Sequence, residues 1–247
     1  MLSSNPTLGQ NVFTRERELG AEKMTISGTV NKSFILLSLV FATALWSWQV
    51  MTGQISAPAY AQGIFMGGAL AGFLIGMLTI FVKKISPYTA PLYALCEGLV
   101  LGFFSAIMEQ RYGGIVFQGV LGTFGTFFFM LFMYQSKMIQ ATDAFKRGMT
   151  MALGGLLFIY VISFILSFFG KNIPYIHESG PIGIAFSVIV VGLASFCLIL
   201  DFDAIEAGER VGAPKYMEWY SAFSLLVTLI WLYMEILRLL AKFRDRR

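Results

Sequence analysis

Charge is scarce in this chain of 247 residues, because only 13% of the residues are Asp, Glu, Lys or Arg while 57% are hydrophobic. The mean hydropathy of +0.71 is far above that of an ordinary water-soluble domain. We therefore predict a polytopic membrane protein. Spans and short connections use nearly the whole length, which leaves no room for a separate soluble catalytic domain.

Histidine and cysteine are also rare. The single histidine, His177, falls in a loop beside Glu178, which argues against a serine-type protease, and the sequence has no metal-hydrolase or phosphate-loop spacing. Cys96 and Cys197 both lie in apolar runs, where a buried thiol is more common than a disulfide or a metal ligand. The residue types therefore favour no enzyme, and we expect none.

Seven apolar segments are long enough to cross a bilayer, which takes about 20 residues of helix. They are 34–51, 63–82, 90–108, 115–134, 148–169, 182–200 and 220–240. Backbone hydrogen bonds must be satisfied inside lipid, so we predict an all-α seven-transmembrane-helix bundle forming one domain over residues 32–247. Glycines at four-residue spacing should allow close helix packing: Gly68, Gly72, Gly76, Gly98 and Gly102.

The first 31 residues are polar and lack the apolar core of a cleavable signal peptide, so we expect a partly disordered cytoplasmic segment.

The net charge of +4 comes from Lys and Arg residues between the spans and in the tails. This distribution favours signals for membrane topology over a groove that binds nucleic acid. Their bias places the amino terminus in the cytoplasm. The basic tail after residue 240 breaks this bias. Either the last span crosses under the protection of the bundle, or one of the last two segments does not fully cross.

Four acids lie in or at the edge of the spans: Glu97, Asp201, Asp203 and Glu235. Intramembrane carboxylates usually face the bundle interior and mark ion or proton routes. Two carboxylates close together in a low dielectric cannot both ionise easily, so they share a proton over a range of pH. The same oxygens suit a hard cation such as calcium.

Each acid also has a structural interpretation. Asp203 can be an interfacial residue that contacts water, and Glu97 can be hydrogen-bonded to a hydroxyl of a neighbouring helix. Arg238 lies one turn after Glu235 on the same helical face and can neutralise it as an ion pair. We favour a functional role for Asp201 and Glu235 together, with Glu97, Asp203 and Arg238 as further candidates around the site.

Two motifs near the carboxyl end favour that choice. Residues 201–205 (DFDAI) close span six, and residues 231–240 (WLYMEILRLL) carry the acid of span seven. They resemble the Asp-(Thr or Phe)-x-x-Ile and Leu-Tyr-Leu-(Asp or Glu)-Ile signatures of the Bax inhibitor/YccA family, also called the transmembrane Bax-inhibitor-motif family. Residues 4–6 (SNP) and 91–99 (PLYALCEGL) resemble its bacterial YccA-like branch.

This resemblance implies a bundle in which the last helix is central, in a bacterial inner membrane. It also implies a pH-sensitive calcium leak governed by one acid from span six and one from span seven, here Asp201 and Glu235. These two are the candidate calcium ligands, and no other cofactor is implied. The sequence departs from the pattern at Glu235, where the best-understood members have Asp. Some bacterial members are implicated in modulating the membrane-anchored AAA protease FtsH.

The spacing of the two acids is long for a direct contact. In a plain hairpin turning at residues 212–214, Asp201 lies 212 − 201 = 11 residues before the turn and Glu235 lies 235 − 214 = 21 residues after it. At 1.5 Å per residue the difference in depth is about 15 Å. Contact would therefore require an irregular turn or a connection that runs along the surface.

Our leading hypothesis is a proton-regulated calcium (cation) leak channel that closes in acid. The alternative is a non-conducting regulator of a membrane protease, with residues 1–31 as its contact, or a membrane protein of stress protection. An intramembrane aspartyl protease is disfavoured because span seven lacks a Gly-x-Gly-Asp motif. A secondary transporter is disfavoured because we find no paired broken helices in two matching halves.

Overall fold

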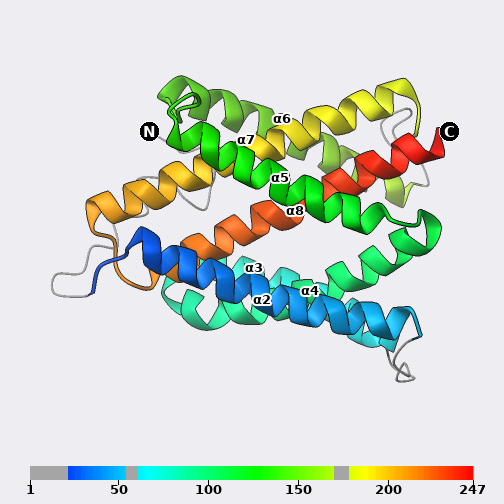
Figure 1. The fold of residues 1–247 in the computed structure, drawn as a ribbon, viewed down its shortest axis with the longest axis horizontal. Coiled ribbons are helices and arrows are strands. Elements are labelled where there is room, and N and C mark those ends of the chain that lie inside the picture. The colour runs from blue at the N-terminus through cyan, green and yellow to red at the C-terminus, as the bar shows by residue number, and fades with distance from the viewer. Residues whose placement is uncertain (1–21, 54–60, 170–177, 247) are drawn as a thin grey trace. The chain divides into compact units, whose positions relative to one another are not determined.

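The computed structural model describes residues 22–53, 61–169 and 178–246, and these ranges are almost entirely helical (Figure 1). Seven long helices follow in order: α2 (Ile26–Met51), α3 (Ala61–Phe81), α4 (Ser86–Arg111), α5 (Ile115–Gln135), α6 (Asp143–Phe168), α7 (Pro181–Val211) and α8 (Met217–Asp245). A 3₁₀ turn, η1 (Lys83–Ile85), precedes α4. All seven are long and apolar enough to cross a membrane, so the prediction of a seven-helix, all-α membrane protein is confirmed.

The helices begin and end at local signals. Thr25 caps α2 by accepting a hydrogen bond from the Gly28 amide, and Thr142 caps α6 by accepting one from the Phe145 amide. Gly212 ends α7 with a φ of 67°, a conformation that glycine adopts without steric cost. Several helices run beyond the apolar segments. α2 begins at Ile26, inside the expected polar tail, and α7 continues to Val211.

The described chain divides into two compact units, which we treat separately. Unit 1 contains residues 114–203 and 228–246, with α5, α6, the first part of α7 and the second part of α8. Unit 2 contains residues 22–113 and 204–227, with α2, α3, α4 and the hairpin that joins α7 to α8. α7 and α8 thus contribute to both units.

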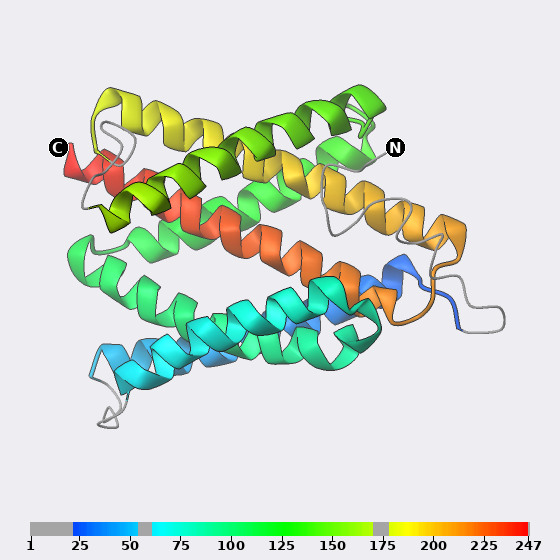
Figure 2. The same ribbon diagram turned by 180° about the vertical axis from the view of Figure 1, so that it is seen from behind.

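In unit 2, α4 packs against both α2 and α3, and the three helices lie side by side in both views (Figure 2). The predicted close approach of helix backbones is confirmed at Gly98 and Gly102. A Cβ on Gly98 would lie 2.5 Å from the Val40 carbonyl oxygen, and one on Gly102 would lie 2.1 Å from the Ala44 carbonyl oxygen. Only glycine at these positions lets the backbones of α2 and α4 come this close.

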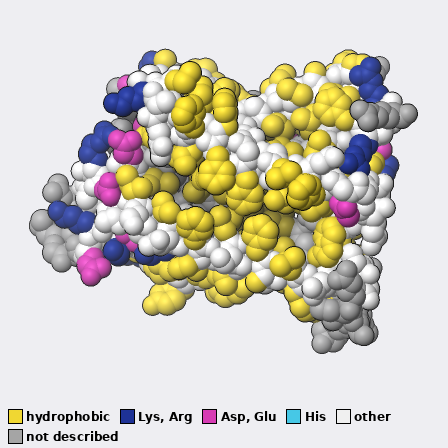
Figure 3. All heavy atoms as spheres, in the orientation of Figure 1, with side chains coloured by type: hydrophobic (Ala, Val, Ile, Leu, Met, Phe, Trp, Pro, Cys, Tyr) yellow, Lys and Arg dark blue, Asp and Glu magenta, His cyan; other side chains and the backbone are white. Residues whose placement is uncertain are grey.

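On the face of the molecule seen in Figure 3, apolar side chains cover the middle and charged side chains gather toward its two sides. Phe34, Phe73, Phe158 and Phe164 are each more than 60% exposed, as expected for side chains that meet lipid. α8 is the most enclosed helix, with 56% of its apolar window buried, against 6% for α6.

Candidate functional site

Asp201 lies on α7 in unit 1 and is completely buried. Its Oδ2 atom accepts a hydrogen bond of 2.6 Å from the hydroxyl of Thr228 on α8. The next residue, Phe202, packs edge-on against Phe127 of α5, with 5.7 Å between the ring centroids. One turn earlier, Cys197 belongs to a buried apolar cluster. The carboxylate therefore sits in an apolar part of the unit, with a hydroxyl as its hydrogen-bond donor.

The short α7–α8 connection explains why Thr228 is the partner. The chain turns at Gly212 and Ala213, whose amides donate to the carbonyl oxygens of Glu209 and Gly208. Thr228 lies 228 − 214 = 14 residues after the turn, and Asp201 lies 11 before it. The difference of three residues is about 4.5 Å in depth, which one side chain can bridge.

Glu235 is also in unit 1 and is only 3% exposed, but its surroundings differ. Its Oε1 atom accepts a hydrogen bond of 2.5 Å from Arg238, and bonds of 3.3 Å from Tyr160 of α6 and from Trp231. Arg238 follows three residues later on α8 and forms an ion pair with it. The local neutralisation considered from the sequence is present.

The structure does not bring Asp201 and Glu235 together. Thr228, which holds Asp201, precedes Glu235 by seven residues, or about 10.5 Å along α8. Among the described residues, Glu235 accepts hydrogen bonds from Tyr160, Trp231 and Arg238. Asp201 is not among these partners, so the described hydrogen bonds do not join the two acids into a proton-sharing pair.

Two other predicted acids have separate environments. Asp203 forms an ion pair of 2.5 Å with Lys146 of α6, with 29% of the Asp203 side chain exposed. Glu97 lies near the middle of α4 in unit 2 and is half-buried, with a hydrogen bond to Tyr93. The described residues contain no group of three or more His, Cys, Asp or Glu that could hold a metal ion.

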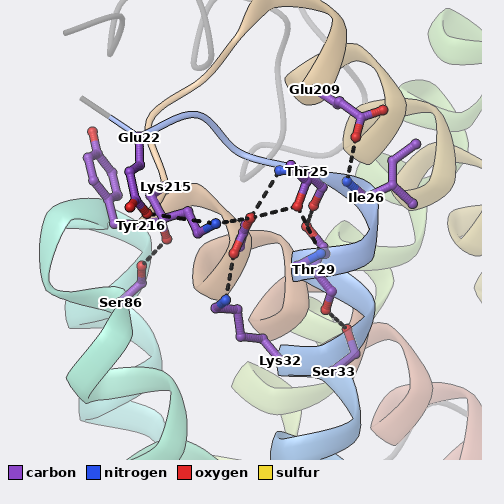
Figure 4. A network of polar contacts seen from close by, with 12 residues as sticks. Glu22, Thr25, Ile26, Thr29, Lys32, Ser33, Ser86, Glu209, Lys215 and Tyr216 are labelled. Carbon is purple, nitrogen blue, oxygen red and sulfur yellow. Dashed lines mark hydrogen bonds and ion pairs between the residues drawn. The ribbon is translucent and has the colours of Figure 1, made fainter. Parts of the chain in front are cut away.

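Sequence reasoning missed a buried acid at the start of α8 in unit 2. Glu218 is fully buried, and its Oε1 accepts hydrogen bonds of 3.0 Å from both the amide and the hydroxyl of Thr25. Figure 4 labels Thr25, Lys32 and Lys215, which belong to this network of polar contacts. Its Oε2 accepts one of 2.5 Å from Lys32 of α2. Lys215 lies 3.4 Å from Oε1.

This cluster fixes the start of α2 to the α7–α8 connection. Glu209 accepts a hydrogen bond of 2.8 Å from the Ile26 amide, and the Met24 amide donates to the Ala213 carbonyl at 2.7 Å. A Cβ on Gly28 would lie 2.1 Å from Glu218 Oε1, so the carboxylate packs directly on the helix backbone. Glu218 lies at the polar edge of the span, where an interfacial acid is ordinary. In the sequence, the available signal for this cluster was Lys32, a cation at the start of the first span.

Comparison with known proteins decides the family. The family described as Bax inhibitor 1 like matches residues 5–245, nearly the whole chain. The chain belongs to the Bax inhibitor 1-like family. No curated protein and no solved structure matches it.

For this Bax inhibitor 1-like protein, the family resemblance inferred from residues 201–205 and 231–240 is confirmed. The narrower assignment to the bacterial YccA-like branch stays a prediction. Residues 4–6, which partly supported it, lie outside the described residues, as does His177.

Proposed function

We propose that this protein is a pH-sensitive cation leak, with calcium as the expected ion and Asp201 as the proton-sensitive group. The observation that supports the proposal most strongly is the fully buried Asp201 carboxylate, bonded to Thr228 across α7 and α8. A protonated carboxyl is neutral and can remain in this apolar contact. An ionised one is costly there and attracts water or a cation.

In this proposal, ionisation of Asp201 loosens the contact between α7 and α8 and admits cations along these helices. Glu235 is the second acid on the route, about 10.5 Å further along α8 from Thr228. Its carboxylate is held by Arg238. It becomes available to a cation only when Arg238 moves away. The two acids then act in succession, in place of the shared pair expected from the sequence, and no step is catalytic.

Calcium flux through the full-length protein in liposomes tests the proposal. We expect flux above that of empty liposomes, higher at mildly alkaline than at mildly acidic pH. Asp201→Asn mimics the neutral acid and should give low flux that no longer depends on pH. Glu206→Gln, at an exposed pair with Arg210, is the matched control and should behave like the wild type. Unchanged flux and pH dependence in Asp201→Asn would rule out the assigned residue, and absence of wild-type flux would rule out the leak.

The alternative, a non-conducting regulator of a membrane AAA protease, stays a prediction. The contact expected for it, residues 1–31, lies mostly outside the described residues. The described part of this segment includes residues 22–25. They precede α2 and are fixed to the rest of unit 2 by the Glu218 cluster.

A further inference from the structure

Glu97 differs from three other buried or half-buried acids in its partners. Glu235, Glu218 and Asp203 each form an ion pair with Arg or Lys. Within the part of the chain that the structure describes, Glu97 forms no ion pair, and its hydrogen bond is to the Tyr93 side chain one turn earlier on α4.

The depth of Glu97 within α4 makes an acid without an ion pair unusual. It lies 97 − 86 = 11 residues from the start of α4 and 111 − 97 = 14 from its end, so about 16 and 21 Å of helix separate it from the two ends. An ionised carboxylate at such depth costs about 2.5–3.5 kcal/mol on insertion scales. Without a cationic partner, the group should favour the protonated form or bind a cation.

The surroundings of Glu97 fit a proton better than a metal ion. On α3, Gly72 faces the carboxylate, and a Cβ there would lie 3.3 Å from Glu97 Oε1. Gly76 faces the ring of Tyr93 at the same distance. Calcium takes six to eight oxygen ligands, whereas these neighbours supply one carboxylate and one phenol. A proton needs only one of those oxygens.

The charged groups around Glu97 are few. The described part of α3, residues 63–81, has no titratable side chain, and the only one on α2 is Lys32, which Glu218 holds. On α4 itself, Tyr93 and Cys96 are the titratable neighbours. From α8, the contact with Tyr93 is the apolar ring of Phe223, at 4.9 Å between centroids.

We propose that Glu97 and Tyr93 form an intramembrane proton-binding site between α3 and α4, separate from Asp201. The carboxyl group takes up and releases one proton. Tyr93 donates a hydrogen bond to the ionised form, and the glycine face of α3 leaves room for the carboxyl. This site gives unit 2 its own response to pH, whether or not the protein conducts cations.

Infrared difference spectroscopy of the full-length protein in lipid, recorded across a pH titration, tests this site without any flux measurement. We expect a carboxyl C=O band that disappears as pH rises, that is missing in Glu97→Gln and that persists in Asp201→Asn. Tyr93→Phe should move its midpoint to higher pH, because the ionised carboxylate loses its donor.

Identical spectra for the wild type and Glu97→Gln would overturn the proposal, as would loss of the band in Asp201→Asn. An unchanged midpoint in Tyr93→Phe would remove Tyr93 from the site. If Glu97→Gln does not fold, Glu97→Asp provides the second test, because it keeps the carboxyl but should shift the band or its midpoint. A band unaffected by that exchange would belong to another acid.

Discussion

The Thr228 hydroxyl donates a hydrogen bond of 2.6 Å to the buried Asp201 carboxylate, and this bond joins α7 to α8 inside unit 1. Neither residue is exposed by more than 6%. A buried acid requires a hydrogen-bond donor, and the Thr228 hydroxyl supplies one. In the proposed function, exchange of a proton at Asp201 would act directly on the contact between these two helices.

Thr228→Val keeps the shape of the side chain and removes the hydroxyl. The ionised carboxylate loses a donor worth about 1.5–3 kcal/mol, so the neutral form is favoured over a wider pH range. We expect the pH at which calcium flux rises to increase by about one unit or more, since one unit corresponds to about 1.4 kcal/mol. Thr228→Ser retains the donor and is the control. A profile for Thr228→Val that overlays the wild type would contradict the prediction.

Arg238→Gln should destabilise the protein because it leaves the buried Glu235 carboxylate without its cation. We expect a loss of about 1–3 kcal/mol in the free energy of unfolding, measured by thermal or denaturant unfolding in detergent. The double variant Glu235→Gln/Arg238→Gln should recover part of it. Arg210→Gln breaks an ion pair whose side chains are 71% and 46% exposed, and should cost less than about 1 kcal/mol. Equal losses in the two single variants would count against a stabilising role for the buried pair.

Gly28→Ala should disrupt the cluster around Glu218. The added Cβ would lie 2.1 Å from Glu218 Oε1, and four donors already hold that carboxylate in place. We expect a loss of stability of about 1–3 kcal/mol, typical of overpacking. Gly148→Ala, on α6, has open space around the added Cβ and should be neutral or stabilising by up to about 1 kcal/mol. If the two variants unfold at the same temperature, the close packing on Glu218 does not limit stability.

Hydropathy predicts all seven helices because lipid requires long apolar segments, but it does not predict their ends. α7 continues eleven residues beyond Leu200, through Asp201 and Glu206, because helix hydrogen bonds persist where the chain leaves the apolar layer. That extension shortens the connection to α8 and sets the register of the two helices. The register, which hydropathy does not contain, makes Thr228 the partner of Asp201.

The sequence is enough to recognise the candidate acids, but it does not predict which residues they contact. A carboxylate inside an apolar run stands out, so Asp201, Glu235 and Glu97 are recognised from the sequence. Their partners are an uncharged threonine, an arginine one turn away and a tyrosine. Glu218 was missed because an acid at the start of a helix is ordinary. Only the fold places Thr25 and Lys32 around it.

If all seven helices cross, the two ends of the chain lie on opposite sides of the membrane. With the amino terminus in the cytoplasm, as we propose, the basic tail would then lie on the outer side, against the usual bias of Lys and Arg. Within unit 1 two cations of this tail form hydrogen bonds. Lys242 donates to the Gly183 carbonyl at 3.0 Å, and Arg244 donates to Gln118 at 3.1 Å. In a bacterial host, a periplasm-active reporter fused after residue 247 should be active. Cytoplasmic location of both ends would mean that one helix does not cross.

The distance between α7 and α8 at two pH values tests the proton-controlled contact most directly. Spin labels at the exposed positions Ile189 and Phe243, both in unit 1, report it in a background with both cysteines replaced. We predict that the distance distribution shifts to longer values at alkaline pH in the wild type and stays at the acidic-pH value in Asp201→Asn. The same distribution at both pH values in the wild type would contradict a contact controlled by Asp201.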